Sequence, residues 1–143
     1  MRRAEPDDWR RCVKSAVFAM IGLAAAGAAV AQAPKGDAAA GQKVYARCLA
    51  CHAVGPGAAN KIGPQLNGVV GRKAAATPGY TYSAALANAK IVWTPAKLDA
   101  YLLSPKTLVP GNKMLFMGLP NAKDRADVIA YVAQYNAAGA TKK

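Results

Sequence analysis

Residues 45–54, YARCLACHAV, hold two of the three cysteines and the one histidine of this chain. Cys48 and Cys51 are three positions apart, and His52 follows the second cysteine directly. The chain has no other histidine, and its third cysteine, Cys12, lies near the N-terminus in a segment of different composition. Such a stretch is compatible with a disulfide, a zinc site, a redox-active dithiol or a haem attachment site, and the rest of the sequence decides among these four.

The first 31 residues differ in composition from the rest of the chain. Residues 1–14 are charged, residues 15–31 carry no charge, and the uncharged run ends in Ala-Val-Ala. A charged flank, an apolar run and small residues are typical of a secretory signal peptide, so we expect export to the periplasm and cleavage after Ala31. The alternative is an uncleaved membrane anchor, for which a run of about 17 residues is marginal. The expected division is a signal peptide over 1–31, a flexible lead-in over 32–36 and one folded domain over 37–143.

The part of the chain beyond residue 31 is strongly basic. It has 14 Lys and Arg residues but only four Asp residues and no Glu, so its net charge is about +10. Such a charge favours an acidic partner and speeds association with it. The lysines are scattered singly, without a basic helix or zinc-finger spacing. We therefore expect an acidic protein partner and no nucleic acid.

Helix signals dominate the rest of the chain. Asp37 and Thr94-Pro95 are typical helix starts, and Pro105 must end the helix that precedes it. We predict helices over 37–50, 83–88 and 94–104 and from residue 121 onward. The stretches 53–81 and 105–120 contain several glycines and prolines, and no segment alternates as a β-strand does. The prediction is an all-α fold with three to four helices and two long loops.

Three of the four candidate sites fit the sequence poorly. A structural zinc ion needs four ligands and a catalytic one needs three plus water, whereas Cys48, Cys51 and His52 are all that the predicted domain offers. The adjacent Cys51 and His52 could hardly both complete a tetrahedron with Cys48. A thioredoxin-type dithiol is expected in a βαβ context, and a disulfide across so short a loop adds little stability.

A covalently attached haem accounts for more of the sequence. Cys-x-x-Cys-His is the attachment signature of c-type haem, in which both thiols bond to the vinyl groups and the histidine ligates the iron. A large apolar cofactor also gives the two long loops a core to wrap. We predict one haem c per chain, attached at Cys48 and Cys51, with His52 as an axial ligand. It follows that the chain without haem should fold poorly.

The second axial ligand must come from a residue other than histidine. The predicted domain has two methionines, Met114 and Met117, and both lie in the late loop. A methionine thioether favours ferrous iron and raises the reduction potential relative to two histidines. The residues by themselves leave three possibilities open: Met114, Met117, or neither, in which case the iron would be five-coordinate and open to small molecules.

Five blocks of this sequence resemble class I cytochrome c, in particular the group of soluble bacterial cytochromes c2 and mitochondrial cytochromes c. The blocks are CLACH, KIGPQLNGVVGRK, PGYTYSAA, PGNKMLFMG and DRADVIAYV. They follow one another in the order and spacing of the family, and the resemblance covers residues 37–135. It implies the cytochrome c fold, in which a few helices and long loops surround one covalently bound haem.

The resemblance also implies roles for individual residues. His52 and Met114 correspond to the axial ligands of the haem iron, and Pro64 to the residue whose carbonyl orients the histidine ring. Gly41 resembles the small residue at which the first and last helices cross, with Tyr131 opposite. The other residues that correspond to the haem environment are Arg72, Tyr82 and Trp93 near the propionates, Tyr101 beside the methionine sulfur, and Asn112 in the methionine loop.

Two further features concern the surface and the methionine loop. Asn112 stands where the family more often has threonine, which implies different hydrogen bonding around the methionine. The residues Pro120-Asn121-Ala122 replace a lysine-rich stretch of mitochondrial members. The residues that resemble the basic ring around the haem edge are Arg47, Lys61, Lys106 and Lys113.

The resemblance implies a one-electron carrier rather than an enzyme. Its expected partners are a cytochrome bc1 complex as donor and a terminal oxidase or photosynthetic reaction centre as acceptor, which it would meet through acidic docking patches. We expect a monomer with no small-molecule substrate. The rival is a haem enzyme or gas sensor, which would need a distal acid–base residue, and the one histidine is already assigned to the iron.

Overall fold

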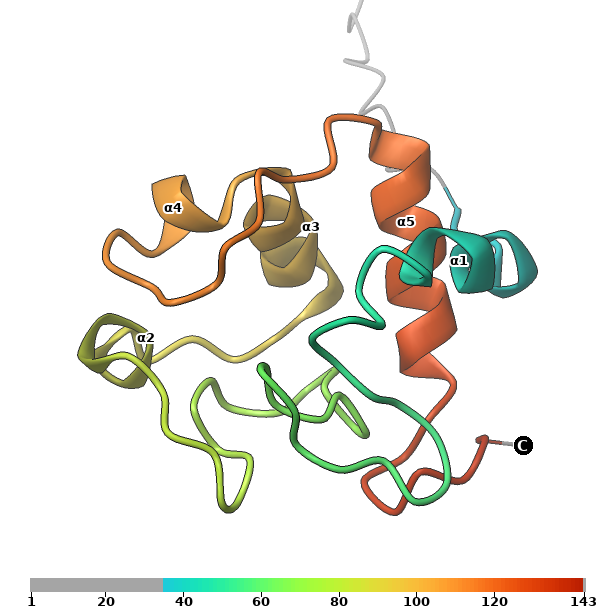
Figure 1. The fold of residues 1–143 in the computed structure, drawn as a ribbon. Helices are drawn as coiled ribbons and strands as arrows, with labels where there is room; N and C mark the ends of the chain where they lie inside the picture. The colour runs from blue at the N-terminus through green and yellow to red at the C-terminus, as the bar shows by residue number, and fades with distance from the viewer. Residues whose placement is uncertain (1–34, 143) are drawn as a thin grey trace, which may run out of the picture. The chain divides into compact units, whose positions relative to one another are not determined.

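The computed structural model describes residues 35–142 (Figure 1). The predicted signal peptide or anchor over 1–31, and most of the predicted lead-in, lie outside the described residues. Five helices occur in the described part: α1 (Ala38–Tyr45), α2 (Ala84–Asn88), α3 (Pro95–Leu103), α4 (Pro105–Leu108) and α5 (Ala122–Ala133). Residues 35–142 contain only two isolated β-bridges besides these helices, so the all-α prediction is confirmed. No helix in this part is both long and apolar enough to cross a membrane.

Helix α1 begins where the sequence predicts but ends earlier. The Asp37 carboxylate caps it by accepting the backbone N–H groups of Ala39 and Ala40. The predicted end at residue 50 is wrong, because the chain tightens after Tyr45 into a turn in which each N–H reaches back three residues. One of these bonds runs from the N–H of Cys48 to the carbonyl of Tyr45, at 2.7 Å. The tight turn therefore sets the position of Cys48, the first cysteine of the Cys-x-x-Cys-His stretch.

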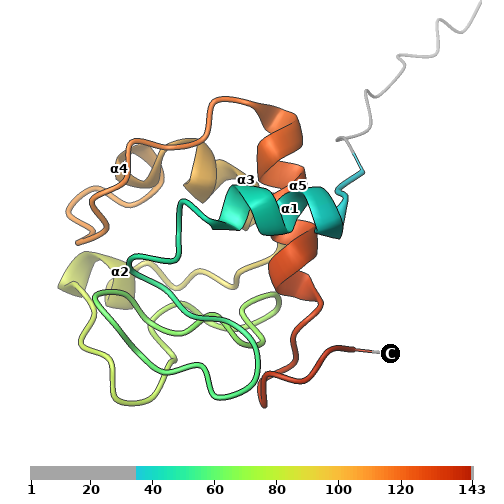
Figure 2. The same ribbon diagram turned by 45° about the vertical axis from the view of Figure 1, so that its right-hand side comes forward.

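The crossing of α1 and α5 fixes the framework of the fold (Figures 1 and 2). Gly41 lies at the crossing, where a Cβ would overlap the carbonyl of Asp127 and lie 2.9 Å from the Cβ of Tyr131. Any larger residue would push the helices apart, so the prediction for Gly41 is confirmed. Helix α5 starts at the predicted cap, where Asn121 accepts the N–H groups of Lys123 and Asp124.

Helices α2 and α3 also follow their sequence signals. Ser83 caps α2 through the N–H of Leu86, and Thr94 caps α3, which ends before Pro105 as predicted. The short helix α4 was not predicted, because it lies inside the stretch 105–120 and is only one turn long. Pro105 at its first position suits a helix start. Ser104 is thus both the C-cap of α3 and the N-cap of α4.

The hydrophobic core draws on both helices and loops. Its buried apolar residues are Tyr45, Val69, Trp93, Leu98, Tyr101, Val109, Leu119, Val128, Ile129 and Val132. Cys48, Met114 and Phe116 pack against this cluster from the cysteine turn and from the methionine loop. The cysteine turn and the methionine loop, which were both predicted to take part in haem binding, therefore pack against the same hydrophobic core.

Candidate functional site

The Cys-x-x-Cys-His stretch forms a compact turn. The carbonyl of Cys48 accepts the N–H groups of both Cys51, at 3.0 Å, and His52, at 2.8 Å. Both cysteines are half-buried free thiols. Burial raises the pKa of the Cys48 thiol, whereas a redox-active cysteine has a lowered pKa. The turn is therefore suited to present two thiols to one bound group rather than to thiol–disulfide exchange.

His52 is held by the loop that follows the turn. Its Nδ1 lies 2.7 Å from the carbonyl oxygen of Pro64, and this contact requires the proton to be on Nδ1. Burial lowers the pKa of His52 below its ordinary value, against the effect of the bond to Pro64. The ring is therefore neutral, and its Nε2 keeps a lone pair for a metal. The partnership of His52 with Pro64 implied by the resemblance is present in the structure.

Gly63 is a site residue that sequence analysis did not single out. A Cβ at this position would overlap Cε1 of His52 and lie 2.8 Å from Nδ1 and 2.9 Å from Nε2. The N–H of Gly63 also donates to the carbonyl of Cys51, at 2.8 Å. Gly63 thus joins the loop to the turn and leaves room for the imidazole. The only signal in the sequence was a glycine directly before Pro64 in KIGPQ.

The methionine loop alternates between inward and outward side chains. Met114 and Phe116 are partly buried against the core. Leu115 and Met117 are 97% and 92% exposed. The residue types alone left both methionines open as iron ligands, and the resemblance favoured Met114; in the structure Met114 packs against the core that Cys48 also contacts. Met117 faces solvent.

Asn112 organises the start of the methionine loop. Its Oδ1 accepts the N–H of Met114 at 2.9 Å and the hydroxyl of Tyr101 at 3.4 Å. Its Nδ2 donates to the carbonyls of Pro105, at 3.0 Å, and Val109, at 2.8 Å. The side-chain amide thereby satisfies its hydrogen bonds with groups from α3, α4 and the loop itself. This network is what asparagine provides at the position where the resemblance expects threonine.

Tyr101 and Trp93 form a buried aromatic pair behind Asn112. Their ring centroids are 4.9 Å apart, and the two residues are 8% and 7% exposed. Burial raises the pKa of Tyr101 to about 12, so its phenol stays protonated and donates to Asn112. Asn112 therefore connects Met114 to Tyr101, because its Oδ1 accepts hydrogen bonds from both residues.

Arg72 and Tyr82, the other two residues expected near the propionates, lie close to each other. Arg72 donates to the carbonyls of Asn67, at 2.8 Å, and Gln65, at 3.2 Å. Burial lowers the pKa of its guanidinium, and the neighbouring Tyr82 opposes that shift. The N–H of Trp93 donates to the carbonyl of Arg72, at 2.9 Å. The structure thus brings Arg72, Tyr82 and Trp93 into one region that can receive a negatively charged group.

The residues expected in the basic ring are all exposed: Arg47, Lys61, Lys106 and Lys113. Three of them also make contacts within the molecule, among them a 3.4 Å hydrogen bond from the ammonium of Lys113 to the carbonyl of Thr81. Arg47 lies 3.8 Å from a carboxylate oxygen of Asp124, and the ammonium of Lys61 donates to the carbonyl of Leu49 at 2.9 Å. The Arg47 ion pair is long and its guanidinium is exposed, so the pair contributes little to stability and Arg47 remains available to a partner.

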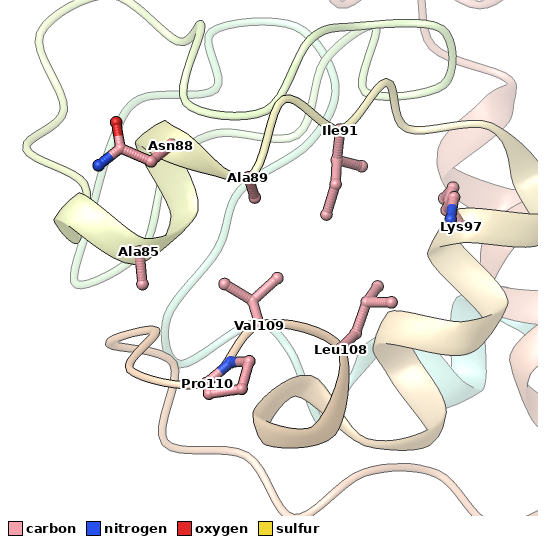
Figure 3. Close-up of a pocket in the computed structure, with 8 residues that line it drawn as sticks. All are labelled: Ala85, Asn88, Ala89, Ile91, Lys97, Leu108, Val109 and Pro110. Carbon is pink, nitrogen blue, oxygen red and sulfur yellow. The ribbon is translucent and has the colours of Figure 1, made fainter.

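A separate surface groove of about 430 Å³ lies between α2, α3 and α4 (Figure 3). Its lining residues are Ala85, Asn88, Ala89, Ile91, Lys97, Leu108, Val109 and Pro110. None of these is a cysteine, a histidine or a methionine. In Figure 3 the amide of Asn88 points away from the groove. The groove is lined by both polar and apolar atoms and contains no candidate haem ligand, although its Val109 accepts a hydrogen bond from Asn112.

The donor set as a whole fits a covalently attached haem better than any bare metal ion. Among residues 35–142, no three His, Cys, Asp or Glu side chains gather into a group that could hold a metal ion. Two thiols in one turn, a neutral imidazole and an inward-facing thioether are the groups that bind and ligate a c-type haem. The cradle formed by Gly63 and Pro64 fixes the imidazole as such a ligand requires.

Comparisons with known proteins agree with this chemistry. The family model for cytochrome c matches residues 38–136. Cytochrome c2 of Blastochloris viridis is 44% identical over 123 residues, which are 86% of this chain and 97% of that protein. Cytochrome c2 of Rhodomicrobium vannielii is 48% identical over 121 residues, which are 85% and 96% of the two chains.

Solved structures extend the likeness to the fold. Cytochrome c2 from Rhodospirillum centenum matches with a TM-score of 0.67 and 38% identity, covering 71% of this chain and 99% of that one. Cytochrome cH from Methylobacterium extorquens matches with a TM-score of 0.64 and 46% identity, covering 68% and 97%. This protein therefore belongs to the cytochrome c family, as a class I cytochrome c with one covalently attached haem c per chain.

Proposed function

We propose that this protein is a periplasmic electron shuttle whose haem iron is ligated by His52 and Met114. Its family makes it a c-type cytochrome that carries electrons. The proposal adds the two axial ligands, the compartment and the partners. When bound, the haem supplies an iron that gains and loses one electron, and the chain holds that iron between fixed donors.

The observation that carries the proposal is the fixed orientation of the two candidate ligands. The bond between Nδ1 of His52 and Pro64 leaves Nε2 as the donor nitrogen. The bond from the N–H of Met114 to Asn112 holds the methionine backbone while its side chain packs inward. Donors that the folded chain holds in place need little reorganisation when the iron changes its charge. A thioether opposite an imidazole also favours the ferrous state.

A closed iron site supports electron transfer rather than turnover of a substrate. Met114 on the iron would exclude small molecules from the sixth position. A peroxidase would need a distal acid–base residue, and the single histidine of this chain is His52. We therefore assign no enzymatic activity and no small-molecule substrate to this protein.

Acidic partners are supported by the distribution of charge. In residues 35–142 the four carboxylates of the expected mature chain make contacts within the molecule, at Asp37, Asp99, Asp124 and Asp127. Lys106 and Lys113 are exposed, and Lys113 lies two residues before the exposed Leu115. We propose transient docking on a cytochrome bc1 complex and on a terminal oxidase or photosynthetic reaction centre. Such docking weakens as salt screens the charges.

The compartment and the oligomeric state are part of the same proposal. Residues 1–31 have the pattern of a signal peptide, and a diffusible monomer suits a shuttle between two membrane complexes. N-terminal sequencing of the protein from a periplasmic extract should read from Gln32. A chain that keeps residues 15–31 and stays with the membrane would support the anchored alternative instead.

The ligands are tested by the absorption spectrum of the exported protein after acid–acetone extraction. Haem that remains on the chain, a low-spin spectrum and the weak far-red band of methionine-ligated ferric iron are the expected results. Met114→Ala should abolish that band, because it removes the thioether. Met117→Ala is the matched control and should retain it, because Met117 is 92% exposed. A high-spin spectrum of the unmodified protein that shifts readily with carbon monoxide would contradict the closed site.

A further inference from the structure

Arg125 is a buried cation near the start of α5. It is 7% exposed, and Asp127 is the only other charged residue that is buried among those the structure describes. A buried charge is costly unless the fold supplies partners for it. The groups that Arg125 contacts therefore indicate which parts of the molecule this cation holds together.

The guanidinium of Arg125 joins three segments of the chain. Its Nε donates to a carboxylate oxygen of Asp99 in α3, at 2.7 Å. Its Nη1 donates to the carbonyls of Leu119, at 2.8 Å, and Pro120, at 2.9 Å. These two carbonyls lie at the end of the methionine loop, just before α5 begins. One planar side chain thus ties α3 and α5 to the end of that loop.

The end of the α3 helix fixes the same part of the loop. The N–H of Leu119 donates to the carbonyl of Leu102 at 2.7 Å, and Leu119 is 2% exposed. Gly118 has a φ of +103°, and a Cβ there would overlap the carbonyl of Leu103. The loop therefore passes close against α3 before it enters α5 (Figure 1). We call residues 118–120 the C-terminal anchor of the methionine loop.

Between its two ends the methionine loop has little support from its own backbone. Within the described part of the chain, residues 113–118 neither donate nor accept a backbone–backbone hydrogen bond. The N–H of Met114 donates instead to Oδ1 of Asn112, and the Met114 side chain packs against the core. The position of Met114 therefore depends on Asn112 at one end of the loop and on the C-terminal anchor at the other.

We propose that Arg125 is a positioning residue for Met114, because it fixes the C-terminal anchor of the methionine loop. The inference rests on the proposed ligation of the haem iron by Met114 and adds a residue that controls how firmly this thioether is held. Arg125 acts through the carbonyls of Leu119 and Pro120. A loop released at this end would gain conformational entropy when the thioether leaves, so an external ligand would replace it more readily.

The proposal is tested by titrating the oxidised holoprotein with imidazole, which competes with methionine for ferric iron. Loss of the weak far-red band reports displacement of Met114 and gives an apparent affinity for imidazole. The free energy of unfolding of each variant is measured by denaturant titration of the same preparation. The two measurements together distinguish a loosened methionine loop from a fold that is less stable throughout.

Arg125→Lys keeps the positive charge but removes the planar fork, so one ammonium cannot reproduce the bonds to Asp99 and to both carbonyls. We expect this variant to bind imidazole about tenfold more tightly, which corresponds to the loss of one hydrogen bond from a charged group. Asp127→Asn is the stability control, since Asp127 bonds to Asp37 and Lys123 and secures the α1–α5 crossing instead. It should lower the free energy of unfolding and leave the imidazole affinity nearly unchanged.

Asp99→Ala is a milder variant of the same contact. The Asp99 side chain is 43% exposed, so its removal leaves the core intact. The variant removes the carboxylate that orients the guanidinium, and its imidazole affinity should rise severalfold. Asp124→Ala is the matched control, because it also removes one carboxylate, but from the long ion pair with Arg47. Its imidazole affinity should equal that of the unmodified protein.

Two outcomes would overturn the positioning role of Arg125. One is that Arg125→Lys and Asp99→Ala bind imidazole no more tightly than their controls; if Arg125→Lys does not fold with haem, the comparison of Asp99→Ala with Asp124→Ala decides. The other is an imidazole affinity that follows the free energy of unfolding across all variants, Asp127→Asn included. Failure of the proposed Met114 ligation is a different result, because the unmodified protein would then lack the far-red band before imidazole is added.

Discussion

Asn112 makes four hydrogen bonds that hold the methionine loop of this cytochrome in place. One side chain receives the N–H of Met114 and the hydroxyl of Tyr101 and donates to two carbonyls. Threonine at this position has one hydroxyl and could not make all four bonds. The methionine loop of this protein is therefore held by a side-chain amide.

Replacing Asn112 with Ala should weaken both the fold and the iron ligation. Loss of the amide leaves the partly buried carbonyls of Pro105 and Val109 without their partner, which costs about 1–3 kcal/mol. We expect denaturant titration of the oxidised holoprotein to give a free energy of unfolding that is lower by that amount. As the pH is raised, the far-red band should be lost at a lower pH than in the unmodified protein. Asn88→Ala is the control, since Asn88 is exposed and its amide points away from the groove. An unchanged band and midpoint in Asn112→Ala would show that the loop does not depend on the amide.

At the scale of elements, the α1–α5 crossing is secured by one carboxylate as well as by Gly41. Asp127 of α5 accepts the N–H of Asp37 at 2.6 Å and the ammonium of Lys123 at 2.5 Å. The bond from Asp37 is the main reason why the pKa of Asp127 lies below its ordinary value, and Lys123 adds to the shift. A single side chain thus joins the start of α1 to the middle of α5.

This carboxylate makes stability depend on pH in a defined direction. Because the pKa of Asp127 is lower in the folded than in the unfolded chain, its contribution is complete above the unfolded value of about 3.9 and is lost as the pH falls through the folded value. We expect Asp127→Asn to lower the free energy of unfolding at pH 7 and to flatten its fall in acid. Asp124→Asn is the control, because its ion pair with Arg47 is long and exposed. Parallel acid profiles for Asp127→Asn and the unmodified protein would refute this role.

At the scale of the whole molecule, the loops depend on what they surround. The stretch 53–81 contains no helix in the structure, and its described backbone bonds are mostly turns and isolated contacts. Ordering each such residue costs about 1–2 kcal/mol of backbone entropy. Much of the compensating contact area must come from the haem that the loops enclose.

Removal of haem should therefore unfold most of the molecule. The chain from residue 32 onward, produced without haem attachment, should show low helix content by circular dichroism and poor dispersion of its amide resonances. The holoprotein of the same sequence is the control and should unfold cooperatively. Native helix content and a sharp unfolding transition in the haem-free chain would show that the protein core alone suffices.

Features that depend on neighbours along the chain could be predicted from the residue types. The Cys48–Cys51–His52 spacing is set by the geometry of one turn, and the caps Asp37, Ser83, Thr94 and Asn121 each bind N–H groups two or three residues away. Local bonds of this kind can be inferred from residue types alone. The haem chemistry, the all-α class and most helix starts followed from them.

Features that depend on contacts between distant segments became visible only in the folded molecule. The inward packing of Met114 and the exposure of Met117 depend on which side of an extended loop faces the core. The need for glycine at position 63 depends on a ring eleven residues earlier in the sequence. The Tyr45–Tyr131 contact joins the first helix to the last. Sequence patterns do not encode such distances, because they arise only when the helices pack and the loops close around the haem.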